Sequence, residues 1–184
     1  KMVTQYVRIP QDRIGVLIGH NGIVKENIEK KSDSRIEVDS TEGEVYIEGI
    51  EGGDPLKVLR VADVINAIGR GFSPENAFLL LDDESLLFDV ISIAHLTPKT
   101  LKRIKGRVIG RNGRTRRVIE DITGVKISVY GKSIGIIGYP HQAIAAHDAI
   151  EMLINGSPHS AVYSFLEKKR RAEERDFFAD DECR

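Results

Sequence analysis

Along residues 1–70, segments with the apolar spacing of a strand and segments with the apolar spacing of a helix follow one another and predict six elements. Residues 35–39 alternate charged and aliphatic side chains, as a half-buried strand does, and Glu42-Gly43 makes the turn to a return strand. Asp54-Pro55 begins a helix, because proline favours the first helical position. The apolar stripe of that helix is predicted at Leu56, Leu59, Val64, Ile65 and Ile68. In order, the predicted elements are a strand over 4–9, helices over 12–18 and 22–31, strands over 35–39 and 44–48, and the helix from 55.

The same succession is predicted a second time, so both halves of the chain follow the order β-α-α-β-β-α and the fold class is α+β. Gly124 follows the second helix of this copy and fits a left-handed cap. The second copy comprises a strand over 86–93, helices over 98–105 and 113–122, strands over 125–129 and 134–137, and a helix over 143–154. Further helices are predicted over 74–81 and from Pro158 to about Asp176.

An internal repeat relates the two copies, because equivalent residues recur at a constant spacing of 91 positions. Six pairs keep this spacing: Gly15 and Gly106, Gly19 and Gly110, Gly22 and Gly113, Ile28 and Ile119, Ile36 and Ile127, Val38 and Val129. Gly49 and Gly138 are 89 apart, so the second copy has lost two residues, which we assign to a hairpin. A repeat of this length indicates a duplicated domain rather than a solenoid unit.

The repeat predicts two tandem domains that pack together, residues 1–70 and residues 85–156. Residues 71–84 are interpreted as a packed linker with a short helix, because their Phe and Leu content is too high for a free one. Residues 157–184 are expected to form a C-terminal helix and an acidic tail.

Each copy places a Gly-x-x-Gly turn between its first two helices, at 19–22 and at 110–113. The N-terminus of the following helix offers unpaired N–H groups and the positive end of a dipole, which together bind phosphate. Glycines on both sides let a sugar-phosphate backbone approach without meeting a Cβ atom. In isolation the motif is weak, but its repetition within this order of elements makes it strong.

The net charge of −1 over 184 residues hides a strong asymmetry. Residues 1–98 carry 10 basic and 17 acidic side chains, whereas residues 99–184 carry 17 basic and 11 acidic ones. Nine basic residues and no acidic one lie between positions 99 and 117: Lys99, Lys102, Arg103, Lys105, Arg107, Arg111, Arg114, Arg116 and Arg117. A run of one sign is typical of a surface that binds a polyanion.

Several function classes find no support in the sequence. It has no apolar run that could span a membrane and no visible signal-peptide pattern, so a cytoplasmic protein is expected. Cys183 is the single cysteine, which excludes a disulfide framework and a cysteine-ligated metal site. The histidines lack metal spacing, and the consecutive carboxylates of Asp82-Asp83-Glu84 would splay rather than converge on an ion. No catalytic motif is present, so we expect a non-enzymatic protein without cofactor or metal.

The segment Val108-Ile109-Gly110-Arg111-Asn112-Gly113, with Ile119 and the strand 125–129, resembles the KH domain in its type I form. The first copy resembles it through residues 17–22 with Ile28. In this family the loop clamps about four nucleotides of single-stranded nucleic acid. The bases lie in an apolar groove between the second helix and the middle strand.

The resemblance implies a role for each matching residue of the second copy. Gly110 and Gly113 would admit the backbone, Arg111 and Asn112 would face phosphates, and Ile109, Ile127 and Val129 would border or support the base groove. With the neighbouring cations, the RNA-binding residues are expected to be Lys105, Arg107, Ile109, Gly110, Arg111, Asn112, Gly113, Arg114, Arg116, Arg117, Ile127 and Val129.

Lys25 and Arg116 depart from the usual KH pattern, since most KH domains have an aliphatic residue three positions after the second glycine. A cation there would reach toward a phosphate or a base edge. Segments 114–116, 119–121 and 155–163 are similar to the small-subunit ribosome assembly factors of the Partner of NOB One family, in an archaeal form. This resemblance implies binding to the 3′ end of small-subunit ribosomal RNA, with the endonuclease that matures it and other assembly or translation factors as protein partners.

Two function classes remain open. The first is a non-catalytic RNA-binding assembly factor that acts mainly through the second copy. The second is a protein-interaction adaptor whose KH folds mainly dock partner proteins. For the first copy, RNA binding and protein docking are equally supported, and the residues concerned are Gly19, His20, Asn21, Gly22 and Lys25.

Overall fold

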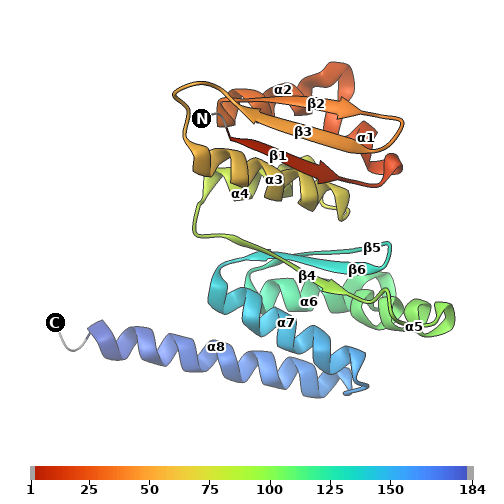
Figure 1. The fold of residues 1–184 in the computed structure, drawn as a ribbon. Coiled ribbons are helices and arrows are strands. Elements are labelled where there is room, and N and C mark those ends of the chain that lie inside the picture. The colour runs from red at the N-terminus through yellow and green to blue at the C-terminus, as the bar shows by residue number, and fades with distance from the viewer. Residues whose placement is uncertain (1–2, 182–184) are drawn as a thin grey trace. The chain divides into compact units, whose positions relative to one another are not determined.

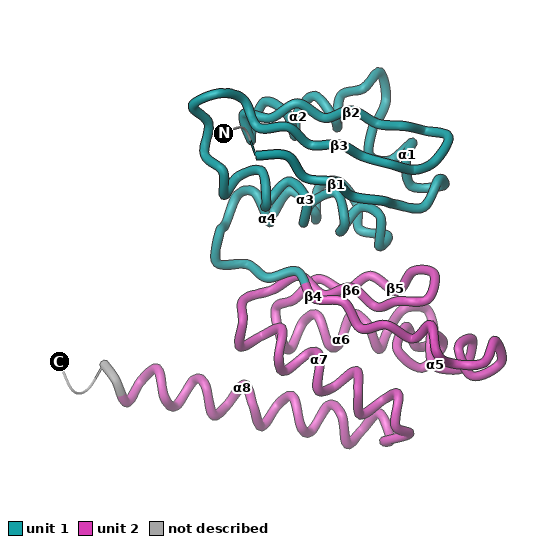
Figure 2. The backbone as a smooth tube through the Cα atoms, in the orientation of Figure 1, with its two compact units in different colours: residues 1–88 teal, residues 89–184 magenta. Residues whose placement is uncertain are grey.

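A boundary between Phe88 and Asp89 divides the chain into two units (Figure 2). The computed structural model describes residues 3–181, so Cys183 and the end of the acidic tail lie outside the described residues. Each unit contains one three-stranded sheet with helices against it (Figure 1).

The first unit follows the predicted order of elements and adds one helix at its end. Its elements are β1 (Thr4–Arg8), α1 (Gln11–Ile18), η1 (His20–Gly22), α2 (Ile23–Ser32), β2 (Ser34–Asp39), β3 (Glu44–Gly49), α3 (Pro55–Gly69) and α4 (Pro74–Asp82). The apolar residues of alternate strand positions, such as Val7, Ile36 and Ile47, are buried, while Tyr6 and Tyr46 on the opposite face are exposed. The sheet therefore has one face in the core and one face in solvent.

The second unit repeats the order and ends in a long helix. Its elements are β4 (Leu87–Ser92), α5 (Pro98–Ile109), η2 (Arg111–Gly113), α6 (Arg114–Thr123), β5 (Lys126–Tyr130), β6 (Ser133–Gly138), α7 (Pro140–Ile154) and α8 (His159–Asp181). Ile104, Ile119 and Ile150 lie at the centre of its core, which continues into α8 through Val162 and Leu166.

The strand order, β1-β3-β2 in one sheet and β4-β6-β5 in the other, puts the second strand of each copy at a sheet edge. The strand that is middle in chain order is therefore not middle in space, because the last strand inserts between the other two. β2 pairs antiparallel with β3, and β5 with β6. An edge strand leaves the N–H and C=O groups of its outer side unpaired within the sheet. The strand that the family resemblance places beside the base groove is consequently an edge strand.

The predicted fold class and the β-α-α-β-β-α order of both copies are confirmed. Gly124 adopts the left-handed conformation predicted for the helix cap, with φ 82°. Three helices are longer than predicted, and one of them, α8, continues to Asp181 instead of ending at about Asp176. α5 continues past Lys105 through the exposed Gly106 to Ile109, and α7 begins at Pro140.

The apolar stripe predicted for α3 is wrong in its first two positions. Leu56 and Leu59 are 66% and 47% exposed, whereas Val58 and Val61 are buried. The helix is apolar over much of its circumference, so helical spacing alone did not single out one face.

The segment 71–86 belongs to the first unit, and α4 and one arginine hold it against the other elements of that unit. Arg60 donates hydrogen bonds to the carbonyl oxygens of Asp83, Glu84 and Leu86 at 3.1, 2.7 and 2.6 Å. The apolar side of α4 is buried at Ala77 and Leu80.

Candidate nucleic-acid interface

The Gly-x-x-Gly loop of the second unit ends one helix and begins the next. The N–H of Gly110 donates to the carbonyl oxygen of Gly106 at 2.8 Å and closes α5. A Cβ atom on Gly110 would lie 2.2 Å from Oγ1 of Thr115, so no other residue fits at this position. Asn112 and Gly113 both have positive φ, at 54° and 73°. The loop therefore depends on residues that tolerate the left-handed conformation.

Gly113 faces open space, in contrast to Gly110. No heavy atom lies within 4 Å of the position that its Cβ atom would occupy, and the same holds for Gly106 on α5. No side chain caps the N-terminus of α6, which begins directly after Gly113. The first N–H groups of α6 and an unobstructed glycine thus lie together, as an anion-binding helix start requires.

The cations expected around this loop fall into two groups. Within the part of the chain that the structure describes, the side chains of Arg111 and Arg114 are exposed and have neither a hydrogen bond nor an ion pair to the protein. The exposed Lys99, Lys102 and Arg103 on α5 are equally unpaired among the described residues. These five side chains are available to an external anion.

The remaining cations are engaged within the protein. The side chain of Lys105 donates to the carbonyl oxygen of Gly131 at 3.0 Å, and that of Arg107 donates to the carbonyl oxygen of Ser157. The guanidinium of Arg117 donates to the carbonyl oxygen of Asn112 at 2.8 Å and so holds the loop from the helix side. Arg107 therefore ties α5 to the segment before α8, although the sequence grouped it with the RNA-binding residues.

The three apolar residues assigned to the groove differ in exposure. Ile127 is 3% exposed and belongs to the core. Ile109 and Val129 are half-buried, and Val129 packs against that core.

A carboxylate that was not among the expected site residues links α6 to the edge strand β5. Oε2 of Glu120 on α6 accepts a hydrogen bond from the N–H of Ile127 on β5 at 3.1 Å. Arg116, one turn earlier, places its Nε 3.7 Å from Oε1 of the same carboxylate. The side chain of Arg116, expected to reach toward a phosphate or a base edge, therefore lies beside Glu120 in this structure. The spacing of 91 residues that relates Glu120 to Glu29 was the signal available in the sequence.

The loop of the first unit has the same backbone but a different charge environment. Gly19, Asn21 and Gly22 all have positive φ, and the Gly22 position is again open. The guanidinium of Arg13 donates hydrogen bonds to the carbonyl oxygens of Ile68 and Phe72, both at 2.8 Å.

Its other charged neighbours are also paired. Lys25 forms an ion pair with Glu29 at 3.1 Å, and Lys30 pairs with Glu26 at 2.7 Å. The residue that follows the loop is the exposed Ile23, where the second unit has Arg114. The first loop therefore offers the helix start without unpaired arginines.

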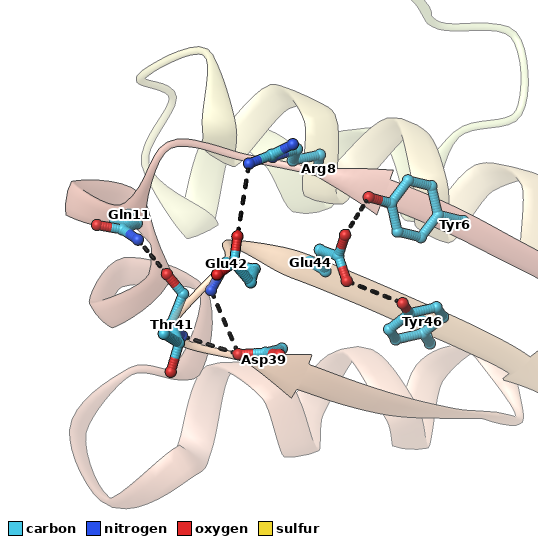
Figure 3. A network of polar contacts seen from close by, with 8 residues as sticks. All are labelled: Tyr6, Arg8, Gln11, Asp39, Thr41, Glu42, Glu44 and Tyr46. Carbon is cyan, nitrogen blue, oxygen red and sulfur yellow. Dashed lines mark hydrogen bonds and ion pairs between the residues drawn. The ribbon is translucent and has the colours of Figure 1, made fainter.

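The solvent face of the first sheet carries a tyrosine pair bridged by a carboxylate (Figure 3). The hydroxyl groups of Tyr6 and Tyr46 each donate to Glu44, both at 2.9 Å, and the ring centroids are 5.3 Å apart. These hydrogen bonds to Glu44 raise the pKa of both tyrosines above the ordinary value of 10.0, with a smaller contribution from burial. Arg8 reaches Glu42 at 3.9 Å beside them.

Helix α8 supports the loop of the second unit from behind. The hydroxyl group of Tyr163 donates to Oγ1 of Thr115 at 3.3 Å, and Thr115 is the residue that fills the space next to Gly110. A ring nitrogen of His159 lies 3.0 Å from the carbonyl oxygen of Arg107.

The described residues contain no group of three or more His, Cys, Asp or Glu side chains placed to hold a metal ion. Asp82, in the acidic cluster, pairs instead with Lys31 at 3.0 Å. Over the same range, no helix has the length and apolar character that crossing a membrane requires.

Two β-α-α-β-β-α units, each with a Gly-x-x-Gly turn between its first two helices, define a tandem KH-domain protein. The family model described as "Eukaryotic type KH-domain (KH-domain type I)" matches residues 87–171, and the model described as "KH domain" matches residues 4–65.

Curated relatives narrow this class. The chain is 44% identical over 170 residues to a KH domain-containing protein of Methanocaldococcus jannaschii, covering 91% of this chain and 74% of that protein. It is 31% identical over 164 residues to the RNA-binding protein pno1 of Dictyostelium discoideum, covering 87% and 69%. The pre-rRNA-processing protein PNO1 of Saccharomyces cerevisiae is 34% identical over 116 residues, which are 61% of this chain and 42% of that protein.

Solved structures agree with these relatives. Dim2p from Pyrococcus horikoshii OT3 is similar with a TM-score of 0.86 and 48% identity, over 90% of this chain and 99% of that one. The structure of an a/eIF2α–aDim2p–rRNA complex from the same organism gives a TM-score of 0.89 and 46% identity, over 93% and 96%. The chain therefore belongs to the PNO1/Dim2 family, as its sequence motifs predicted.

Proposed function

We propose that this protein is a non-catalytic, single-stranded RNA-binding factor of small-subunit ribosome assembly, which binds the 3′ region of the small-subunit rRNA mainly through residues 85–156. One observation carries the assignment to the second unit. Its loop combines an uncapped helix start, an open Gly113, and the unpaired Arg111 and Arg114.

The chemistry of this arrangement suits a phosphate backbone. The N–H of Arg114 already donates to the carbonyl oxygen of Arg111, so the N–H groups that follow it in the first turn of α6 donate to phosphate oxygens, and the open glycine lets the sugar-phosphate chain approach. Arg111 and Arg114 neutralise charge on either side of the glycine. Phosphate contacts position the strand, whereas sequence is read by groups that reach base edges.

The names of the relatives support RNA as the ligand in this proposal. One of them is named an RNA-binding protein and another a pre-rRNA-processing protein, and aDim2p has been crystallised in a complex with rRNA and a/eIF2α. For this chain we infer the same class of RNA partner. Protein partners would be the endonuclease that matures the rRNA and other assembly or translation factors.

A protein-docking role for the first unit is the second candidate, and the charge environment of its loop favours it. Arg13 and Lys25 are engaged internally, and Ile23 presents an exposed apolar side chain beside the loop. Under this reading the residues 1–70 recruit a protein while the second unit holds the RNA.

The test compares matched aspartate substitutions in the two loops. Gly113→Asp and Gly22→Asp both enter open space at nearly the same φ, so their costs to folding are matched. Binding of a labelled oligonucleotide from the 3′ end of small-subunit rRNA is measured against a scrambled strand and the matching duplex. We expect Gly113→Asp to abolish single-strand binding, because it places an anion at the phosphate site, and Gly22→Asp to retain most of it.

Several outcomes would overturn the proposal. If the wild-type chain does not bind the oligonucleotide, the protein-interaction adaptor becomes the better supported function. Equal losses in the two variants would remove the emphasis on the second unit, and equal affinity for the scrambled strand would remove the assignment to the rRNA 3′ region. Circular dichroism of each variant verifies that it is folded.

A further inference from the structure

Glu120 makes a contact that phosphate binding does not use. Ile127 lies on the edge strand β5, and its N–H points away from β6 to Oε2 of Glu120. This hydrogen bond fixes the orientation of the carboxylate between α6 and β5. A carboxylate oxygen is an acceptor only, so it can bind donors but repels other acceptors.

The second oxygen of Glu120 is incompletely used. Its nearest cation is Nε of Arg116 at 3.7 Å, beyond hydrogen-bond distance, and that Nε is buried without a hydrogen-bond partner. The side chain of Glu120 retains 21% exposure. The pair therefore balances charge while leaving Oε1 able to accept a hydrogen bond from a ligand.

The first unit contains the equivalent glutamate, Glu29, with a hydrogen bond to each of its two oxygens. Oε2 of Glu29 accepts from the N–H of Ile36 at 3.0 Å, and Oε1 accepts directly from Nζ of Lys25 at 3.1 Å. Both oxygens of Glu29 are thus occupied. Among the described residues, the duplicated glutamate accepts from the edge strand in both units, and its other oxygen lacks a hydrogen bond in the second unit alone.

We propose that Glu120 is a specificity-determining residue, which accepts a hydrogen bond from the exocyclic amino group of a base and so selects cytosine over uracil. This inference rests on the proposed function, because it needs a single strand held at the loop. Cytosine presents an N4 amino donor, for which a carboxylate is a suitable acceptor. Uracil presents an oxygen at the same position and would face Oε1 acceptor to acceptor, which disfavours it.

The test measures binding of the full chain to oligocytidylate and oligouridylate of equal length. We expect wild-type protein to bind the cytidine strand roughly tenfold more tightly, within the range of a single base contact. In Glu120→Gln the amide can present either a donor or an acceptor, so the ratio should fall toward one while both strands still bind.

Glu29→Gln is the matched control, since Glu29 makes the same hydrogen bond to an edge strand. It should leave the ratio between the two strands unchanged. A second readout needs no variant: strands of pyrimidin-2-one riboside, which is cytidine without its amino group, should bind wild-type protein about as weakly as oligouridylate.

The outcomes separate this inference from the proposed function. If wild-type protein binds no single strand, the proposed function fails. If it binds both strands equally, or if Glu120→Gln keeps the wild-type ratio, Glu120 does not read a base and the RNA-binding function stands. If Glu120→Gln does not fold, tight binding of the pyrimidin-2-one strand by wild-type protein would by itself overturn the inference.

Discussion

At the scale of single residues, the two glycines of one loop are required for different reasons. Both glycines have a positive φ, but Gly110 in addition has no room for a side chain because Thr115 fills the space, whereas Gly113 faces open space. The first glycine therefore serves packing, and the second leaves a path for a ligand. The sequence motif treats the two positions as equivalent, and only their surroundings distinguish them.

The tyrosine pair on the first sheet predicts a pH effect. Because hydrogen bonds to Glu44 raise the pKa of Tyr6 and Tyr46 in the folded state, the stabilisation they give is present below pH 10.0 and is lost as the pH rises through the folded pKa values. In an ultraviolet titration of tyrosinate, Glu44→Gln should shift part of the absorbance change to lower pH. Tyr6→Phe and Tyr46→Phe should remove the late part of the wild-type curve. A Glu44→Gln curve identical to wild type would contradict this assignment.

At the scale of elements, α8 is part of the second unit's core. Val162 and Leu166 are buried with residues of α5, α6 and α7, and Tyr163 reaches Thr115 behind the loop. Beyond this contact region the helix is exposed, and Phe177 and Phe178 pack only edge to face on one another at 5.8 Å among the described contacts. The helix thus divides into a supporting half and a projecting half.

This division predicts unequal effects of truncation along α8. Leu166→Ala removes a fully buried side chain and should lower the free energy of unfolding by about 2–5 kcal/mol. Phe178→Ala, at an exposed position, should change it by less than about 0.5 kcal/mol. Urea denaturation followed by circular dichroism measures both. Similar losses for the two variants would mean that α8 does not divide in this way.

At the scale of the whole molecule, a net charge near zero conceals two units of opposite character. The unpaired cations of the described residues near a loop belong to the second unit, where Arg111 and Arg114 flank Gly113. In the first unit Ile23 stands at the position of Arg114, and the nearby Lys25 and Arg13 are paired within the protein. Two domains of one fold are therefore expected to differ mainly in their electrostatic attraction for a polyanion.

The salt dependence of RNA affinity tests this difference. Replacing Arg111 and Arg114 by alanine together should reduce the slope of log affinity against log salt by roughly 1.4, at about 0.7 for each phosphate contact on a single strand. The control removes two exposed cations from the first unit, Arg8→Ala with Arg35→Ala, and keeps the net charge change equal. Its slope should match that of wild type. A control slope reduced to the same extent would show a general charge effect.

The elements and the loop motif were predictable because they depend on local signals. Alternation, proline at helix starts and glycine at positive φ act within a few residues, and the spacing of 91 positions revealed the duplication. The face of α3 was not predictable, because several of its sides are apolar and only packing against the sheet chose between them.

The sequence by itself determined the two α+β units, the loops between their first helices, and the concentration of basic residues in the second half. Tertiary packing decided part of which cations are free: the side chains of Lys105 and Arg107 donate to carbonyl oxygens 26 and 50 positions away along the chain, whereas Arg116 and Arg117 find partners within five positions. It also decided that the strand beside the groove is an edge strand whose N–H meets a glutamate. Long-range pairing sets the partners of a polar side chain, and composition does not.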